Sequence, residues 1–356
     1  MKTWDSLKDL LLTHTELTSG GKPFVHHHAA HCETGVTAAL FRDKGLEISE
    51  PMIFGIGSGI FFGHLPFVKF VGLPISTYRA QPGAVFRKAA KRLDGKFVTK
   101  KYTNAKKGMD ELLRVLRSGQ IVGLTTNIYW LSYFPDRFRF QFNGHNIVIL
   151  HEIENGFRVS DPVLDKPVDC RTEDLIRARF ARGPLEPHGF MYYPVSVNLH
   201  PDLRGACIKG MLDTCNMMLR IPVPIFGIRG IRFLAGRIIK FEKTQGFDEA
   251  CRQLGMIVRM QEEVGTGGAG FRYMYAAFLQ EAADLFGSAE LNDLSQDMTA
   301  IGDTWREFAV TAARIIKKRG KQDETFAKAG GLMLICAGRE ENLFKNLHEI
   351  AGKLKS

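Results

Sequence analysis

The sequence predicts an α+β domain at the N-terminus, followed by a mostly α-helical domain. Before about residue 200, helix-period patterns alternate with short apolar runs that end at turn residues, which is typical of helices packed on a sheet. Beyond Leu199-His200-Pro201 the apolar period is almost entirely helical. The 356 residues also suffice for two domains of ordinary size. We therefore expect domains over residues 1–200 and 201–356.

Local patterns predict the first elements of the N-terminal domain. Residues 1–22 form a lead-in that ends at Ser19-Gly20-Gly21. A helix opens at Cys32, continues through a mostly apolar run and ends at Arg42 to Gly45. Met52 to Phe62 is apolar and punctuated by glycines, so we expect a strand and a tight turn packed on the core. The alternative is the wall of a substrate channel, because glycine lets a ligand approach the backbone closely.

The rest of this domain alternates between the two periods. Residues 129–142 are aromatic and basic, and we interpret them as a loop and strand that line a cleft beside His145; stacking on nucleic acid is the alternative. The other expected elements are helices at 84–93 and 105–117, a buried strand at 120–126, strands at 147–150 and 157–160 joined by an Asn155-Gly156 turn, a helix capped at Thr172 that runs through 175–180, and a strand at 190–197.

The C-terminal domain shows helical periodicity without an internal repeat. The expected helices cover about 203–219, 246–263, 270–286, 289–318, 322–336 and 340–354, and we expect the longest to break near Gly302.

Composition narrows the class of protein. Hydrophobic residues make up 45% and charged residues 24%, as in globular proteins. The net charge of +10 suggests an acidic partner, but no nucleic-acid-binding signature accompanies it, so we expect no nucleic acid. The N-terminus lacks the apolar core and cleavage site of a signal peptide, and the longest apolar stretch contains several glycines and prolines. We expect a cytoplasmic protein whose six cysteines are reduced.

Cys32 is the first candidate for chemistry. A cysteine in the first turn of a helix faces unpaired backbone N–H groups and the positive end of the helix dipole. Both favour the thiolate, which is the nucleophilic form. The alternative is a buried cysteine that acts as a small hydrophobic residue, as most free cysteines do.

His145 and Asp161 complete a possible catalytic arrangement. His145 precedes the strand at 147–150, and Asp161 ends the strand at 157–160. Antiparallel pairing across the Asn155-Gly156 turn would bring both residues to the same end of the hairpin. An imidazole oriented by a carboxylate, beside a cysteine on a helix, is an arrangement of nucleophile, base and orienting group.

These motifs resemble the papain-like superfamily and its peptidase C39-like branch. More narrowly, residues 31–62 together with GHNIVILHEIENGFRVSDP and TEDLIRARF resemble the butirosin biosynthesis protein H family. GTGGAGFRYMYAAFLQEAADLF and the downstream IGDTWREFA resemble the helical domain that often follows it. The resemblance implies a papain-like fold for residues 1–200. It also implies an acyltransferase that moves an acyl group from a carrier protein or coenzyme A thioester to an amine in antibiotic biosynthesis.

The resemblance also directs attention to the oxyanion hole. Papain-like enzymes usually carry a glutamine six residues before the cysteine, where this chain has His26. The backbone N–H of Cys32 is one expected donor by position. For the second donor we consider His26, His31 and Asn146, with His28 as a further alternative.

Two other patterns suggest ligands. His27 and His31 are four residues apart, but without a Cys or Asp partner at ligand spacing other than Cys32 we expect no metal. Residues 265–270 form a glycine-rich loop before a helix, for which a tight turn is the first interpretation. If the donor is acyl-phosphopantetheine, Gly267, Gly268 and Arg272 are candidate phosphate contacts. We expect no permanently bound cofactor.

Residues 221–241, IPVPIFGIRGIRFLAGRIIKF, mix apolar and basic side chains. They fit a core helix with basic side chains that reach solvent. The alternatives are docking of an acidic acyl carrier protein and, below it, contact with a membrane surface.

Two functional alternatives to an acyltransferase remain. A cysteine peptidase or amidase would share the triad and release the acyl group to water, and a binding protein would keep the fold without catalysis. A homodimer is a further alternative for the assembly.

Overall fold

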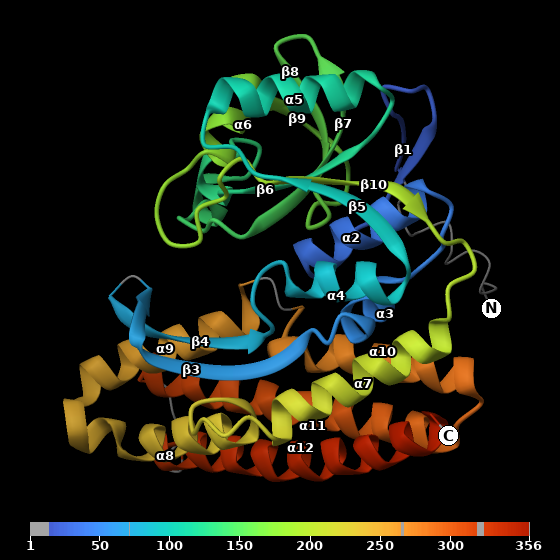
Figure 1. Cartoon of the computed structure of the whole chain (residues 1–356). Helices are drawn as coiled ribbons and strands as arrows, with labels where there is room; N and C mark the ends of the chain where they lie inside the picture. The colour runs from blue at the N-terminus through green and yellow to red at the C-terminus, as the bar shows by residue number, and fades with distance from the viewer. Residues whose placement is uncertain (1–13, 71, 265–266, 319–323, 356) are drawn as a thin grey trace, which may run out of the picture. The chain divides into compact units, whose positions relative to one another are not determined.

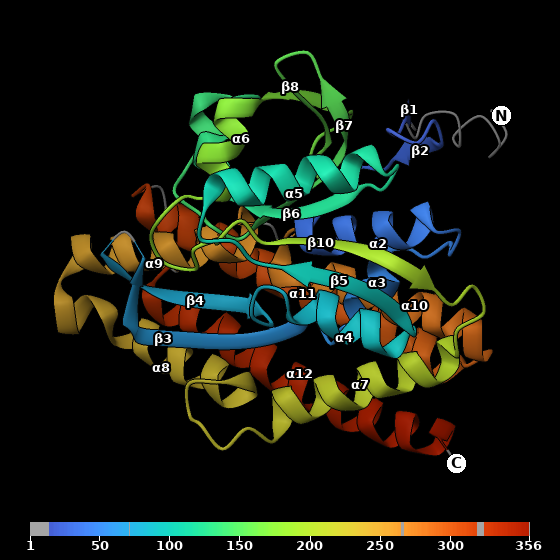
Figure 2. The ribbon, with the colours of Figure 1, turned by 45° about the horizontal axis from the view of Figure 1, so that its top comes forward.

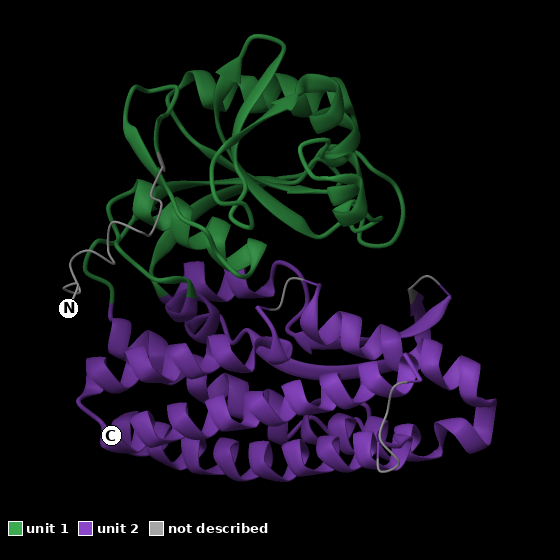
Figure 3. Ribbon diagram, turned by 180° about the vertical axis from the view of Figure 1, so that it is seen from behind, with its two compact units in different colours: residues 1–50, 93–201 green, residues 51–92, 202–356 purple. Residues whose placement is uncertain are grey.

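The computed structural model describes residues 14–70, 72–264, 267–318 and 324–355. The chain divides into two compact units, which Figure 3 shows in different colours. The first unit contains residues 1–50 and 93–201, and the second contains 51–92 and 202–356. The predicted boundary at residue 200 therefore falls next to a boundary between units, but residues 51–92, which we expected in the first domain, pack with the helical unit.

The first unit is built on a six-stranded antiparallel sheet with the strand order β5-β10-β6-β7-β8-β9. Figure 2 shows β5, β10 and β6 passing side by side through its centre. A separate hairpin of β1 and β2 precedes the sheet. The strands are β1 (His14–Leu17), β2 (Pro23–His26), β5 (Gly95–Lys100), β6 (Val122–Thr126), β7 (His145–Ile153), β8 (Gly156–Ser160), β9 (Val168–Arg171) and β10 (Met191–Val197).

Two helices cover opposite faces of this sheet. Helix α2 (Cys32–Asp43) contacts β6, β7 and β10, and its Leu40 lies over Gly123, where an added Cβ would be 3.1 Å from the leucine Cδ1. Helix α5 (Ala105–Arg117) shares a hydrophobic core with Leu124, the next residue of β6, and with Ile147 and Ile149 of β7. Successive strand residues point to opposite faces, so α2 and α5 lie on opposite sides. Helix α6 (Thr172–Arg179) and the short turns η1 (Ile128–Trp130) and η2 (Asp136–Phe138) complete the unit.

The second unit is mostly helical, as the sequence predicted, and adds the two-stranded hairpin β3–β4 (Figure 1). Helix α12 packs along α8, α11 and α7, and α8 and α9 also contact the hairpin. Its elements are β3 (Ile60–Phe70), β4 (Leu73–Arg79), α4 (Ala84–Arg92), α7 (Leu203–Leu219), α8 (Gly227–Gln245), α9 (Phe247–Glu262), η3 (Ala269–Phe271), α10 (Arg272–Phe286), α11 (Ala289–Ile316) and α12 (Phe326–Lys355).

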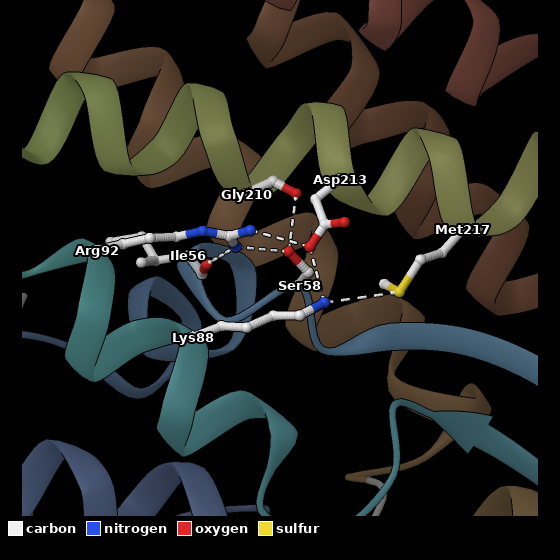
Figure 4. A network of polar contacts seen from close by, with 7 residues as sticks. All are labelled: Ile56, Ser58, Lys88, Arg92, Gly210, Asp213 and Met217. Carbon is white, nitrogen blue, oxygen red and sulfur yellow. Dashed lines mark hydrogen bonds and ion pairs between the residues drawn. The ribbon is translucent and has the colours of Figure 1, made fainter.

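A polar network explains why α4 belongs to this unit (Figure 4). Asp213 of α7 accepts hydrogen bonds from Lys88 Nζ at 2.7 Å and Arg92 Nη2 at 2.9 Å. Arg92 also donates to Ser58 Oγ at 2.7 Å and to the carbonyl of Ile56. Ser58 in turn donates to the carbonyl of Gly210 at 3.3 Å. The two ends of the 51–92 segment are thus attached to α7.

Three predicted elements differ from the structure. Residues 50–56 form helix α3 (Glu50–Ile56) instead of a strand, and a turn at Ser58, with φ +53, leads into β3. Helix α11 continues through Gly302, where an added Cβ would be 2.7 Å from the Tyr273 ring, so the glycine admits a close neighbour instead of breaking the helix. The predicted helices at 322–336 and 340–354 are one continuous helix, α12.

Candidate active site

Cys32 is the first residue of α2, as predicted. The preceding residue, His31, is extended and forms the N-cap without a side-chain hydrogen bond to the helix backbone. Glu50 binds the residues just before the helix: its carboxylate accepts from the backbone N–H of Ala30 at 3.0 Å and of His31 at 2.8 Å, and also from Thr34 Oγ1 at 2.8 Å. The carboxylate therefore anchors the backbone just before the cysteine and lies at the positive end of the helix dipole.

The loop before Cys32 is also fixed to the segment that carries Asp161. The backbone N–H of Ala29 donates to the carbonyl of Pro162 at 2.6 Å. An added Cβ at Gly35, one turn into α2, would be 2.7 Å from the Cβ atoms of Ala29 and Pro162. No other residue type fits at position 35 without a shift, so the glycine allows the cysteine helix to lie directly against the Asp161-Pro162 turn.

His145 and Asp161 meet as the predicted hairpin requires. Strands β7 and β8 pair antiparallel, with Val148 opposite Ser160, so the start of β7 lies beside the end of β8. His145 Nε2 lies 2.7 Å from Asp161 Oδ2, and both side chains are buried. This contact leaves Nδ1 of the imidazole for Cys32, with which His145 is also hydrogen-bonded.

The environment of His145 favours the protonated ring. Burial alone would lower the pKa of His145, but the charge and hydrogen bond of Asp161, together with the contact to Cys32, outweigh burial and raise the pKa to about 10. At neutral pH the ring therefore carries a proton beside the cysteine sulfur. A cationic neighbour of this kind favours the thiolate.

Tyr133 is a site residue that the sequence analysis did not single out. Its hydroxyl donates to Asp161 Oδ2 at 2.8 Å, and the backbone N–H of Val163 donates to Oδ1 at 3.2 Å. Burial and the nearby Asp161 raise the pKa of Tyr133 well above its usual value, so the hydroxyl keeps its proton and remains a donor. Tyr133 belongs to the aromatic segment 129–142 that we placed beside His145, but no pattern in that segment distinguishes Tyr133 from Tyr129 or Phe134.

The structure separates the oxyanion candidates. His26 Nε2 lies 2.8 Å from the carbonyl of Leu164 and Nδ1 lies 2.8 Å from Ser160 Oγ. His31 Nδ1 lies 3.1 Å from Thr34 Oγ1. Asn146 Nδ2 lies 3.9 Å from the Cys32 sulfur. His28, the further alternative, is exposed. The structure thus brings Cys32, His145, Asp161 and Asn146 together, while their catalytic roles stay predictions.

The structure corrects the phosphate contact that we predicted for Arg272. Its guanidinium is fully buried and binds Glu340 through two hydrogen bonds of 2.9 Å, and it also donates to the carbonyl of Gly270 at 2.7 Å. Its cation lies 5.0 Å from the centre of the Trp305 ring. Arg272 thus stabilises the helical core and does not present its charge to solvent.

The glycine-rich loop is described only in part. Gly265 and Thr266 lie outside the described residues. Gly267 and Gly268 both have positive φ, at +63 and +89, and lead into η3. Two successive glycines with positive φ fit the tight turn that was our first interpretation of the loop, and the predicted phosphate contact at Gly267 and Gly268 remains untested.

Helix α8 accounts for most of the mixed apolar and basic segment at 221–241. Its apolar residues Ile228, Ile231, Leu234, Ile238 and Phe241 are buried. A helix that lies on a membrane surface inserts its apolar face, and here that face is already packed in the protein. The structure therefore argues against the membrane-surface interpretation and fits a core helix with exposed basic residues.

Within the described residues, no group of three or more His, Cys, Asp or Glu side chains could hold a metal ion. In the same part of the chain, none of the helices combines the length and apolar composition that a membrane-spanning helix needs.

An α+β unit in which a helix that begins with a cysteine meets a His–Asp pair on an antiparallel sheet is the arrangement that the sequence predicted. Two family models match the chain. Residues 31–162 match the N-terminal domain of butirosin biosynthesis protein H, and residues 173–347 match a domain of unknown function, DUF4872. The chain thus carries the first of these domains followed by the second.

Comparison with solved structures found similarity to a structure described as a C39-like peptidase from Bacillus anthracis. The two share 16% sequence identity over 47% of this chain and 89% of that chain, with a TM-score of 0.33. Comparison with curated proteins found no match.

Proposed function

We propose that the protein is an acyltransferase that moves an acyl group from a thioester to an amine through Cys32. The observation that carries the proposal is the buried arrangement of Cys32, His145 and Asp161, in which the Asp161 carboxylate and the contact to Cys32 raise the pKa of His145. A thiolate beside a protonated imidazole would supply a nucleophile and a proton donor in the same place.

The reaction has two halves. The Cys32 thiolate attacks the thioester carbonyl, a carbon–sulfur bond forms, and the carbonyl electron pair moves to oxygen. When this tetrahedral oxyanion collapses, the donor sulfur leaves with the proton of His145, and the acyl group stays on Cys32. The amine then attacks the acyl-enzyme, His145 accepts its proton, and collapse releases the amide and restores Cys32.

The proposed donor is acyl-phosphopantetheine on an acidic carrier protein, with coenzyme A as the alternative carrier; this thioester is a substrate and not a bound cofactor. The basic surface of α8 supports an acidic partner. Arg229, Arg232, Arg237, Lys240 and Lys243 are all exposed, and their spacing of three to five residues places them on one side of the helix. The acceptor is a small-molecule amine.

Intact-protein mass spectrometry tests the proposal. The wild type and Cys32→Ala are incubated with acyl thioesters on carrier protein and on coenzyme A. We expect an acyl adduct on the wild type alone, which added amines discharge faster than water does. Cys170→Ala is the matched control, since Cys170 is also buried in this unit and burial raises its pKa to about 12.

The other outcomes separate the remaining classes. Discharge by water as fast as by any amine would indicate a peptidase or amidase. An adduct that persists in Cys32→Ala, or no adduct with any donor, would contradict the proposal, and the second result would indicate a binding protein.

A further inference from the structure

Asn146, the residue after His145 on β7, has a buried amide that faces two different environments. Its Nδ2 lies 3.1 Å from the carbonyl of Gly144 and 3.9 Å from the Cys32 sulfur. Its Oδ1 lies 3.0 Å from the hydroxyl of Tyr192 and 3.4 Å from that of Thr125. The amide therefore lies between β10 on one side and the cysteine on the other.

The hydrogen-bond partners determine which end of the amide faces the sulfur. The carbonyl of Gly144 can only accept, so it requires the NH₂ group. The hydroxyls of Tyr192 and Thr125 can donate to Oδ1. In the flipped orientation Oδ1 would face the Gly144 carbonyl, and two acceptors would meet without a hydrogen. The NH₂ group thus faces the cysteine, and one of its hydrogens is directed to Gly144.

His26 occupies the position, six residues before the cysteine, that usually supplies the oxyanion donor, but its ring has other hydrogen-bond partners here. The carbonyl of Leu164 can only accept, so His26 must donate its Nε2–H to it. The other ring nitrogen of a neutral His26 accepts from Ser160. His26 therefore joins β2 to the segment around Asp161, and its N–H is already used.

We propose that Asn146 is the second oxyanion donor, beside the backbone N–H of Cys32, and that Tyr192 is the positioning residue that directs its amide. An oxyanion on a carbon that is bonded to Sγ can come within hydrogen-bond reach of a nitrogen 3.9 Å from that sulfur when it points toward Asn146. The inference rests on the proposed function in one respect, since it assumes that Cys32 attacks a carbonyl.

The test compares two reactions of Cys32. In acylation by p-nitrophenyl acetate, the thiolate adds to the carbonyl, an oxyanion forms, and its collapse expels p-nitrophenolate. In alkylation by iodoacetamide, the thiolate displaces iodide and no oxyanion forms. We expect Asn146→Ala to slow the acylation burst by about 10²–10³-fold and to leave the alkylation rate nearly unchanged.

Tyr192→Phe tests the positioning role. Removing one hydroxyl leaves the ring in place, so we expect acylation to slow by roughly tenfold or less. In the Asn146→Ala background the same change should have no further effect, because the amide that it directs is gone. Tyr193→Phe is the matched control: the next residue of β10 points to the other face of the sheet, and its side chain is hydrogen-bonded to Arg114.

Equal losses of acylation and alkylation in Asn146→Ala would overturn the inference, because Asn146 would then support the nucleophile or the fold. Acylation that Asn146→Ala leaves intact would also overturn it, as would a wild type that p-nitrophenyl acetate does not acylate at Cys32. A wild type that reacts with p-nitrophenyl acetate but with no thioester would refute the proposed function and still permit the inference to be decided.

Discussion

Asp161 determines the charge of His145. Burial lowers the pKa of this histidine, whereas the carboxylate, together with the contact to Cys32, raises it to about 10. With the carboxylate in place, the His145 ring is protonated at neutral pH and can donate its proton to a leaving group. Tyr133 and the backbone of Val163 hold the carboxylate in place, so the protonation of the histidine also depends on the residues that bind Asp161.

Asp161→Asn should therefore lower the pKa of His145. The amide keeps the size of the side chain but removes the charge, so that burial, which lowers the pKa, is opposed mainly by the contact to Cys32. Titration of labelled histidine by NMR measures this directly, with a wild-type transition near pH 10. Asp169→Asn, which removes an exposed carboxylate paired with Arg158, is the control and should leave the transition in place. A transition near pH 10 in Asp161→Asn would contradict this account.

Arg272 shows how a local sequence pattern can suggest the wrong role for a residue. Arg272 follows a glycine-rich loop at the start of a helix, which is also how a phosphate site appears. Its partner Glu340 is 68 residues away on α12, and nothing near Arg272 in the sequence indicates that pairing. By contrast, His145 and Asp161 were predictable because a single hairpin joins them.

Among the helices, α8 separates the apolar and basic residues that alternate along its sequence onto a buried side and an exposed side. The buried side holds α12 and the β3–β4 hairpin, and the exposed side carries five basic residues and the single acidic residue Glu242. Arg232 pairs with Glu341, but the other four basic residues leave an excess of positive charge. Such an excess mainly increases the association rate with an oppositely charged partner, and salt weakens this effect. The basic side of α8 is thus available for an encounter with an acidic protein.

Reversing charges on α8 should weaken the use of a carrier-bound donor. In Arg229→Glu/Lys240→Glu, we expect KM for the acyl carrier protein to rise by roughly tenfold at low salt, with little change in kcat, because docking precedes chemistry. Kinetics with the matching coenzyme A thioester should change much less. Lys106→Glu/Lys107→Glu on α5 alters two exposed lysines by the same total charge and is the control. Equal effects of both double substitutions would show that only net charge matters.

Element types were more predictable than element ends and continuity. Helix α7 occupies the predicted 203–219, because its apolar period is long and unambiguous. The short apolar run at 52–56 gave the wrong type, because a run of this length fits a strand or a buried helix equally well. The break that we predicted at Gly302 was wrong. The ring of Tyr273 occupies the space beside this glycine, and the packing of the helix offsets the low helix propensity of glycine.

At the scale of the molecule, the segment 51–92 lies outside what local patterns can predict. Periodicity tells which side of an element is buried, but not which other element covers it. The contact between α4 and α7 depends on Lys88 and Arg92 and on Asp213, which follows them by more than 100 positions, and no motif signals that they pair. Of the three boundaries between the units, the sequence therefore indicated only the one after residue 201.

Asp213→Asn tests this connection. Burial raises the pKa of Asp213, but hydrogen bonds from Lys88 and Arg92 outweigh burial and lower it below 3.8. A carboxyl group whose pKa is lower in the folded state stabilises the protein above its unfolded pKa, and this contribution is lost as pH falls through the folded value. We therefore expect Asp213→Asn to lower Tm by a few degrees at pH 7 and to have little effect near pH 2.

Thermal unfolding followed by circular dichroism measures both values. Asp110→Asn, an exposed carboxylate that pairs with Lys106 on α5, is the control and should change Tm little at either pH. A loss of Tm in Asp213→Asn that is equal at both pH values would contradict the charge-based explanation.

The path of the chain has a consequence for dissection of the protein. Because residues 51–92 leave the first unit and return to it, the chain passes between the units after residues 50, 92 and 201. A fragment ending at residue 201 would keep every residue of the proposed triad, yet it would deprive Ile60, Phe62 and Tyr78 of the helices that bury them. We expect such a fragment to aggregate, because these apolar side chains would be exposed to solvent. Replacing residues 51–92 with a short linker would be the rational way to obtain the triad-bearing unit alone.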